Sequence, residues 1–279
     1  MHPSQQLRAL LATGTTLVMP DAYDPLSARI IMESGYAAVQ CSGYSFARAA
    51  ACPSEAEFGF ERNLRLTADI VRAVSVPVMA DGEDGFGGPE VVYRSVRAYI
   101  DAGAAGMNLE DQVLDVPDSG RVVTRDLALA KLAAALAATR DADLPAFLIN
   151  ARTDALAVAS DKQAGLREAI ERANAYLEAG AGLAFVTGVT SLAQVRVLVA
   201  AIDGPLSIAA GMATNADAFS IADLVACGVA RVSLPTLPLY AALDGLRGAL
   251  ARVARANTFD ALPRAVLSGS CSPAPAKEA

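Results

Sequence analysis

The sequence is poor in several residue types that catalytic and binding motifs need, and each shortage excludes a class of function. Histidine occurs once, as His2 at an N-terminus that we expect to be frayed, so Ser-His and Cys-His catalytic systems are excluded. The cysteines, Cys41, Cys52, Cys227 and Cys271, include no Cys-x-x-Cys pair, which excludes the common zinc and thiol-redox motifs. We expect these thiols to be buried or incidental.

Long apolar runs and an excess of positive charge are also missing. No apolar stretch reaches the length needed to span a bilayer, and no basic leader precedes an apolar segment, so we expect a cytoplasmic protein with no membrane partner. The chain carries 23 Lys and Arg against 30 Asp and Glu, and its net charge of −7 argues against nucleic acid as a partner. A small anionic substrate needs only local positive charge and is compatible with this balance.

Small and branched apolar residues are abundant. Hydrophobic residues make up 53% of the chain and aromatic residues 5%, with no tryptophan, so we expect a core of alanine, valine, leucine and isoleucine. Short apolar runs alternate with longer amphipathic segments, which indicates a parallel sheet with crossover helices. The pattern predicts strands at 16–22, 37–43, 77–83, 105–111, 146–154, 183–187, 206–210 and 230–234, and helices at 25–34, 62–74, 89–102, 124–140, 162–179, 191–201, 216–227 and 239–254.

These strand–helix units predict an α/β fold, a closed (β/α)8 barrel of the TIM type, because both faces of a parallel sheet must be covered. An open doubly wound sheet is the alternative. A length of 279 residues fits one large domain, and no break in composition separates two. We therefore expect a single domain at 1–262 that includes the C-terminal helices, followed by a flexible tail at 263–279.

Polar side chains stand where several of the expected strands end. In such a barrel the C-terminal ends of the strands form one rim, which carries the active site. The rim residues are Ser42 on the second strand, Asp81 and Glu83 on the third, Glu110 and Asp111 on the fourth, and Arg152 on the fifth. We therefore expect one site, with Asp81, Glu83 and Glu110 as oxygen ligands of Mg²⁺ or Mn²⁺. Solvated turns are the alternative, since Asp-Gly is also a turn dipeptide.

Other interpretations of the rim motifs are less consistent with the sequence. Phe86 stands where a calcium-binding EF-loop needs glycine, and Val92 stands where it needs a bidentate glutamate. The glycines after Asp81 do not complete the Gly-x-Gly-x-x-Gly fingerprint of dinucleotide binding. Arg152 can hold a carboxylate through two parallel hydrogen bonds, although a structural ion pair with Asp154 is the alternative.

Four motifs, in this order, resemble the isocitrate lyase/phosphoenolpyruvate mutase superfamily. They are Cys41-Ser-Gly-Tyr44, Ala80-Asp-Gly-Glu-Asp-Gly-Phe-Gly87, Gly106-Met-Asn-Leu-Glu-Asp-Gln112 and Asn150-Ala-Arg-Thr-Asp154, within a resemblance that covers about residues 16 to 250. The resemblance implies that Asp81, Glu83 and Glu110 are the metal-linked acids. It also implies that Arg152 binds a substrate carboxylate, with Ser42, Gly43, Tyr44 and Asp81 as further substrate-binding residues.

Enzymes of this superfamily act on 2-oxo acids or release them, usually with Mg²⁺. The resemblance therefore implies a carbon–carbon lyase acting on an acid such as oxaloacetate, pyruvate or 2-oxoglutarate, through an enolate that the metal stabilises. Superfamily members are typically dimers of dimers that exchange their last helix. The resemblance thus also implies a homotetramer, with the segment after Pro238 as the exchanged helix.

The sequence departs from the superfamily pattern at three places. The lyases carry a KKCGH-like motif with a catalytic cysteine, but residues 113–121 here contain no Cys, Lys or His. Ser54, with Glu55 beside it, stands where mutases and phosphonopyruvate hydrolases have an aspartate. Glu83 replaces an aspartate, and its extra methylene can change direct metal contact into contact through water.

The sequence assigns catalytic roles incompletely. We expect Tyr44, Glu110 and Arg152 to be catalytic, and the candidates for the general acid or base are Tyr44, Glu110, Asp115 and Asp118. A hydrolase or decarboxylase of oxaloacetate-like acids, or a 2-oxo acid-binding protein with reduced catalysis, are the alternatives, because the cysteine motif is missing. A Schiff-base aldolase is disfavoured, since Lys131 and Lys162 fall on expected helices.

Overall fold

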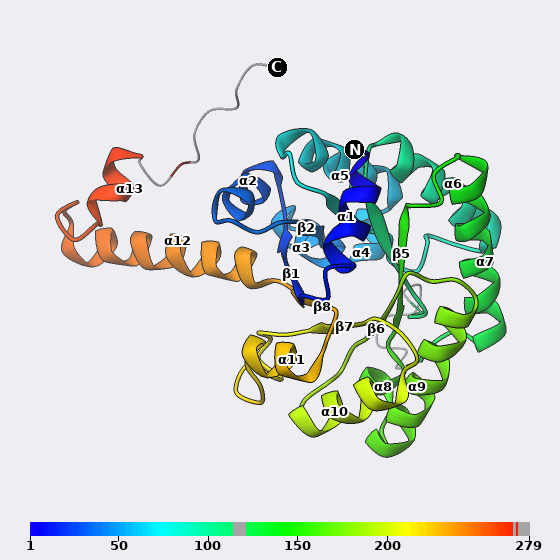
Figure 1. Ribbon diagram of the computed structural model, residues 1–279. Helices are drawn as coiled ribbons and strands as arrows, with labels where there is room; N and C mark the ends of the chain where they lie inside the picture. The colour runs from blue at the N-terminus through cyan, green and yellow to red at the C-terminus, as the bar shows by residue number, and fades with distance from the viewer. Residues whose placement is uncertain (114–120, 270–271, 273–279) are drawn as a thin grey trace.

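The structure is a closed barrel of eight parallel strands surrounded by helices (Figure 1). This computed structural model describes residues 1–113, 121–269 and 272. The strands are neighbours in chain order, and β8 pairs with β1 to close the sheet, which confirms the predicted (β/α)8 barrel. The strands are β1 (Leu17–Ala22), β2 (Val39–Cys41), β3 (Val78–Asp81), β4 (Gly106–Glu110), β5 (Leu148–Thr153), β6 (Leu183–Val186), β7 (Leu206–Ala209) and β8 (Arg231–Leu234).

Several helices begin at residues that favour a helix start. Thr124 accepts a hydrogen bond from the N–H of Leu127 and caps the helix predicted to follow it, and Pro89 occupies a first-turn position. The helices are α1 (Pro3–Leu11), α2 (Pro25–Glu33), α3 (Gly43–Ala49), α4 (Glu55–Phe58), α5 (Phe60–Ala73), α6 (Pro89–Asp101), α7 (Arg125–Asp141), α8 (Ala155–Val158), α9 (Lys162–Glu178), α10 (Leu192–Ala201), α11 (Ile221–Cys227), α12 (Leu237–Ala256) and α13 (Arg264–Ser268).

Two short helices follow β2 where the sequence predicts a loop. Ser42 caps α3 by accepting a hydrogen bond from the N–H of Ser45, and Ser54 caps α4 in the same way. Both helices are too short to show a clear apolar period in the sequence. The helix predicted at 216–227 begins only at Ile221, because Ser220 forms a capping box with Asp223.

Side chains on the strands alternate between the barrel interior and the surrounding helices. On β5, Ile149 and Ala151 pack with apolar residues of the outer layer, whereas Asn150 points inward and donates a hydrogen bond to Asn108 on β4 at 2.7 Å. Apolar side chains fill the interior at the end that α1 covers, and polar side chains gather above them toward the other end. This gradient places charged side chains at the C-terminal rim.

The helix α1 closes the opposite end of the barrel. Leu7 is fully buried and packs with apolar side chains at the start of several strands. Arg8 donates from Nε to the carbonyl oxygen of Ala146 at 2.7 Å. Nδ1 of His2 accepts a hydrogen bond from the N–H of Ser4 at 3.2 Å, so the N-terminus is capped and the expectation of fraying is wrong.

The long helix α12 leaves the barrel instead of packing along it. Figure 1 shows α12 extending outward, with α13 at its far end. Of the α12 residues, all of which the structure describes, Leu239 is the one that is buried. Leu246 and Leu250 are 57% and 62% exposed. The described residues form no helix that is both long and apolar enough to cross a membrane. Much of the predicted tail at 263–279 lies outside the described residues, so the domain boundary at 262 stays a prediction.

Candidate active site

The three acids predicted to bind metal lie together at the rim. Asp81 ends β3, Glu83 follows in the next loop, and Glu110 ends the neighbouring strand β4. The N–H of Glu110 donates to the carbonyl oxygen of Glu83 at 2.9 Å, which joins the loop to the strand. All three residues are at least nine-tenths buried. The strands therefore place these acids at neighbouring positions of the rim, and their role as metal ligands stays a prediction.

Gly43, from the neighbouring β2–α3 segment, lies against two of these acids. Its N–H donates to Oδ2 of Asp81 at 2.9 Å. A Cβ atom at this position would lie 1.5 Å from Oε1 of Glu83, so a side chain here would displace that carboxylate. The N–H of Gly43, a residue that the resemblance implies to bind substrate, is thus bonded to Asp81, while Ser42 beside it caps α3.

Tyr44 lies at the outer part of the rim. Its side chain is exposed, and its hydroxyl lies 2.9 Å from the hydroxyl of Tyr240 on α12. This hydrogen bond, followed by partial burial, raises the pKa of Tyr44. The structure therefore links Tyr44 to the protruding helix, and its predicted catalytic and substrate-binding roles stay predictions.

The loop after β3 is held in a strained conformation. Glu83 and Phe86 have φ angles of 47° and 64°, in the left-handed region that non-glycine residues seldom adopt. Lys131, buried on α7, donates from Nζ to the carbonyl oxygen of Asp84 at 2.7 Å and lies 3.2 Å from its carboxylate. The Phe86 ring packs against Phe60 with centroids 5.1 Å apart. These contacts fix the loop that presents Glu83.

Arg152 faces the acids from β5. Its Nε and Nη2 donate to the two carboxylate oxygens of Asp154, both at 2.9 Å. Its Nη1 lies 2.5 Å from Oε2 of Glu110, its partner residue across the β4–β5 pair. Burial alone would lower the pKa of Arg152, but Asp154 and Glu110 outweigh it and raise that pKa. The arginine thus stays charged at the rim, and the ion pair with Asp154 that we weighed as an alternative is present.

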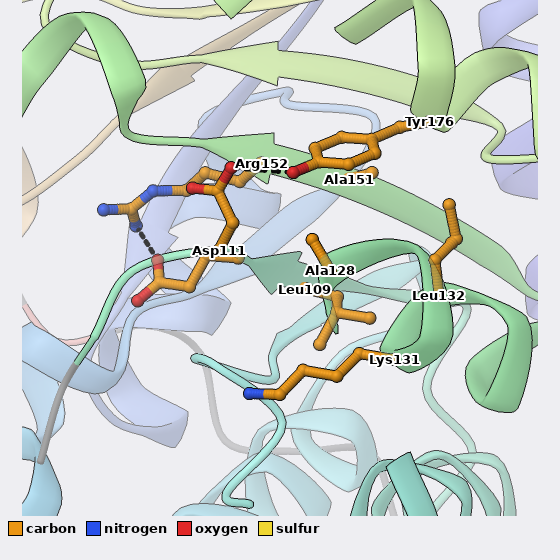
Figure 2. A pocket seen from close by; sticks show the side chains of 9 residues that line it. Leu109, Asp111, Ala128, Lys131, Leu132, Ala151, Arg152 and Tyr176 are labelled. Atoms are coloured by element: carbon orange, nitrogen blue, oxygen red, sulfur yellow. Dashed lines mark hydrogen bonds and ion pairs between the residues drawn. The ribbon is translucent and has the colours of Figure 1, made fainter. Parts of the chain in front are cut away.

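Asp111 holds the ends of β4 and β5 in place from behind the rim. Its Oδ1 accepts the N–H of Asp154 at 3.0 Å, and its Oδ2 accepts the hydroxyl of Tyr176 at 2.7 Å and Nη1 of Arg172 at 3.2 Å. Figure 2 shows Asp111 between Arg152 and Tyr176, at a cavity that Lys131 also lines. Asp111 therefore fixes the residue that orients Arg152.

A second arginine lies inside the barrel below the rim. Arg231 is fully buried and donates from Nη1 to the hydroxyl of Ser207 at 2.8 Å and from Nη2 to Oε1 of Gln40 at 2.5 Å. Burial lowers the pKa of Arg231 to about 10. Above it, Asp21 at the end of β1 accepts a hydrogen bond from the hydroxyl of Ser233 at 3.0 Å. The barrel interior therefore adds a further carboxyl group and a further guanidinium group to the site.

Burial and mutual repulsion raise the pKa of the rim acids. Burial is the largest cause for Glu83, followed by the charges of Asp81, Glu55 and Glu110. Burial also raises the pKa of Asp81 and Glu110, against the opposing charge of Arg152. The same cause raises the pKa of Glu55 to about 7 and that of Asp21 to about 8. So many carboxyls around two guanidinium groups favour the binding of protons or of a cation.

The carboxylate oxygens at the rim are ligands of the type that a hard divalent cation binds. Oδ1 of Asp81 is buried and has no well-aligned hydrogen-bond partner among the described residues, although the N–H of Glu83 and the side chain of Asn108 also act on this carboxylate, so Oδ1 can accept a cation. In the described part of the chain, however, no three His, Cys, Asp or Glu residues are grouped so as to hold a metal ion. Glu110 is turned to Arg152, and completing an oxygen site requires Glu110 or Glu83 to turn toward Asp81.

Sequence reasoning missed several residues that the structure places at or beside the site. Asp21 ends the first strand, and the rule that identified Asp81 could have found it. Glu55, noted in the sequence only as the neighbour of Ser54 at the position of the family's aspartate, lies near Asp81, Arg152 and Asp154, with which it interacts electrostatically. No sequence signal distinguished Arg231, because a single arginine within a short apolar run does not show whether its side chain faces the barrel interior. Asp115 and Asp118, two acid–base candidates, lie outside the described residues.

Comparison with known proteins gives a family match over most of the chain. A family model described as phosphoenolpyruvate phosphomutase matches residues 7–254. A Corynebacterium glutamicum protein named "Probable 2-methylisocitrate lyase 2" is 38% identical over 204 residues, which cover 72% of this chain and 64% of that protein. The match thus spans slightly less than two thirds of that relative.

Two solved structures share the fold over almost the whole chain. Oxaloacetate acetylhydrolase in complex with the product oxalate superposes with a TM-score of 0.85 at 30% identity, covering 95% of this chain and 90% of the other. Phosphonopyruvate hydrolase in complex with oxalate and Mg²⁺ superposes with a TM-score of 0.83 at 28% identity, covering 97% and 96%. These proteins are similar to this chain in both sequence and architecture.

Proposed function

The chain belongs to the phosphoenolpyruvate phosphomutase family, within the isocitrate lyase/phosphoenolpyruvate mutase superfamily, and from this premise we propose that it is a Mg²⁺-dependent carbon–carbon lyase. Its substrate is a small 2-oxo acid, such as oxaloacetate, or the aldol-type adduct of one. Relatives named 2-methylisocitrate lyase and oxaloacetate acetylhydrolase support this substrate class. Mn²⁺ is expected to replace Mg²⁺, because both accept oxygen ligands.

One observation carries the proposal. A charged guanidinium, Arg152, stands opposite buried carboxylates at a single rim, and one oxygen of Asp81 there has no hydrogen-bond partner among the described residues. Such a rim suits a dicarboxylate that meets the arginine at one end and a cation at the other. A structural salt-bridge cluster alone would leave no reason for the unpartnered oxygen of Asp81.

The residues of the chain divide the chemical tasks between them. Arg152, oriented by Asp154, holds a substrate carboxylate. The Ser42–Gly43 segment is expected to hold a second one, for which the Gly43 N–H must exchange its present partner, Asp81. A bound divalent cation would supply positive charge that stabilises the enolate released by bond cleavage. Glu55 and Asp21, whose pKa values burial raises to about 7 and about 8, can hold a proton near neutral pH and are candidates for its transfer.

The proposal is tested with Mg²⁺ and a panel of 2-oxo acids and 2-hydroxy tricarboxylates, with each product identified by mass spectrometry. We expect turnover of at least one acid, loss of that turnover in EDTA, and its recovery with Mg²⁺ or Mn²⁺. Arg152→Met should lower kcat/KM by at least about a hundredfold, because the charge-assisted contact with the substrate carboxylate is lost. Absence of turnover across the panel, together with binding that is unaffected by EDTA, would refute the proposal.

A second candidate is a 2-oxo acid-binding protein with reduced catalysis. The observation in its favour is the absence of Cys, Lys and His from residues 113–121, where the lyases carry their catalytic cysteine. A hydrolase or decarboxylase of oxaloacetate-like acids is compatible with the same absence. Calorimetry that shows tight, Mg²⁺-dependent binding without any turnover would select the binding protein.

We also propose that the chain assembles through α12 into a homo-oligomer, a dimer of dimers. The exposed leucines of α12 support this proposal, because an apolar helix that projects from its own barrel gains stability by packing on a second copy. Tyr240, in the first turn of α12, already contacts Tyr44 at the rim.

A further inference from the structure

Arg152 holds its two acid partners in different ways. Asp154 accepts hydrogen bonds from Nε and Nη2 as a two-pronged pair, with both distances at 2.9 Å. Nη1 lies 2.5 Å from Oε2 of Glu110, but that oxygen has no aligned hydrogen-bond partner among the described residues. Asp154 is therefore the fixed partner of Arg152, and Glu110 is the exchangeable one.

Neighbouring elements hold Asp154 in place. Its backbone N–H donates to Asp111 at 3.0 Å, and its Oδ1 accepts the hydroxyl of Thr187 at 2.8 Å. Among the described residues, Oε2 of Glu110 is by contrast held by its ion pair with Arg152, and only 1% of the Glu110 side chain is exposed. A buried charge that loses its partner is strongly destabilising. Glu110 can thus leave Arg152 when another cation takes its carboxylate.

The position of Glu110 affects two ligand sites at once. Nη1 is the guanidinium atom that Asp154 leaves free, on a side chain that is 23% exposed, so an incoming carboxylate would bind there. Glu110 now covers this atom. Glu110 also belongs to the acids expected to hold the cation, and in its present position it does not join Asp81. One carboxylate therefore blocks the anion site and leaves the cation site incomplete.

We propose that Glu110 is a latch: paired with Arg152 it closes the carboxylate site, and a divalent cation opens that site by taking Glu110. The cation then binds before the dicarboxylate, and Arg152 changes one acid partner for another without being left unpaired. This inference rests on the proposed function, because it takes a cation and a dicarboxylate to be the ligands. It goes further by assigning the order of their binding to one named ion pair.

The latch is tested without a metal ion, so that chelation of the anion by the cation cannot produce the result. Metal-free wild-type protein and Glu110→Gln are titrated with oxalate, a small dicarboxylate, in EDTA by calorimetry. The amide keeps the shape of the side chain but gives up its charge, so Nη1 becomes available. We expect Glu110→Gln to bind oxalate at least about tenfold more tightly than the wild type. Equal or weaker binding by the variant overturns the proposal.

Two further variants locate the effect. Glu110→Gln combined with Arg152→Met should lose the gain, and a gain that persists without the guanidinium also overturns the latch. Glu90→Gln removes an acid from an exposed ion pair with Arg94 on α6, 2.9 Å in length, and should bind oxalate as the wild type does. If circular dichroism shows that Glu110→Gln is unfolded, Glu110→Asp replaces it, because its shorter side chain also withdraws the carboxylate from Nη1.

The latch and the proposed function can fail independently. If Glu110→Gln binds oxalate more tightly without metal but the wild type turns over no acid, the latch is supported and the proposed lyase activity is refuted. If the wild type shows turnover but the variant shows no gain in oxalate binding, the activity is supported and the latch is refuted.

Discussion

At the scale of single residues, the protonation of Asp21 makes the stability of the folded protein depend on pH. Burial raises its pKa to about 8 from an ordinary value of 3.8, with Arg231 acting in the opposite direction. Between these two values the folded protein keeps a proton on Asp21 that the unfolded chain has lost. The folded state binds more protons, so the free energy of unfolding falls as the pH rises through this range.

Asp21→Asn should remove this contribution to the pH dependence. An asparagine amide oxygen can still accept the hydrogen bond from Ser233, but it does not titrate. One pKa unit corresponds to about 1.36 kcal/mol, so we expect the variant to lose less stability than the wild type between pH 5 and pH 8, by a few kcal/mol at most. Urea unfolding at both pH values measures the difference. Identical losses in the two proteins would show that Asp21 does not carry this proton.

At the scale of elements, the loop between β3 and α6 depends on Lys131. The loop adopts left-handed backbone angles at Glu83 and Phe86, and Lys131 holds it through both the carbonyl oxygen and the carboxylate of Asp84. Strained backbone persists when surrounding contacts fix it, and it is common at functional sites. Lys131 therefore acts on the site by positioning Glu83, and the structure gives it no place among the reacting groups.

Lys131→Met should loosen this loop and weaken cation binding. Residues that support metal ligands without touching the metal typically change its affinity about tenfold or more, and we expect a loss of that size for Mn²⁺ measured by calorimetry. Lys162→Met is a matched control, because Lys162 likewise donates to carbonyl oxygens, those of Leu156 and Ala157, on α8. Unchanged Mn²⁺ affinity in Lys131→Met, with the fold intact, would exclude the positioning role.

At the scale of the whole molecule, α12 should decide the oligomeric state. Replacing Leu246 and Leu250 together by glutamate puts charge on the exposed apolar face, and since both side chains already face solvent the barrel should fold unchanged. We expect the mass measured by light scattering to fall from that of an oligomer to that of a monomer. Val197→Glu, at an exposed position on α10, serves as the control. A variant with the wild-type mass would place the interface elsewhere.

Much of the barrel and its rim could be predicted from the sequence, for a physical reason. A buried parallel strand is an apolar run, and it ends where polar side chains reach solvent or a site, so Asp81, Glu110 and Arg152 were marked by their positions. That neighbouring strands bring their terminal side chains to the same rim then follows from topology alone. These features depend on local pattern and chain order, and both are visible in one sequence.

The pairing of side chains across strands could not be predicted in the same way. That Glu110 faces Arg152 follows from the β4–β5 register, which no local pattern specifies. Arg231 is in the interior because Gln40 and Ser207, far away in the chain, supply acceptors for its charge. The helices α3 and α4 were missed because each is too short to repeat an apolar period.

The seal that α1 forms at the base of the barrel has a consequence for the order of events in a cleavage reaction. With Leu7 and its apolar neighbours filling that end, the substrate of the proposed cleavage reaction enters at the C-terminal rim, and both of its fragments leave there. The two fragments then share one route out, so a fragment that is still bound competes directly with the next substrate molecule.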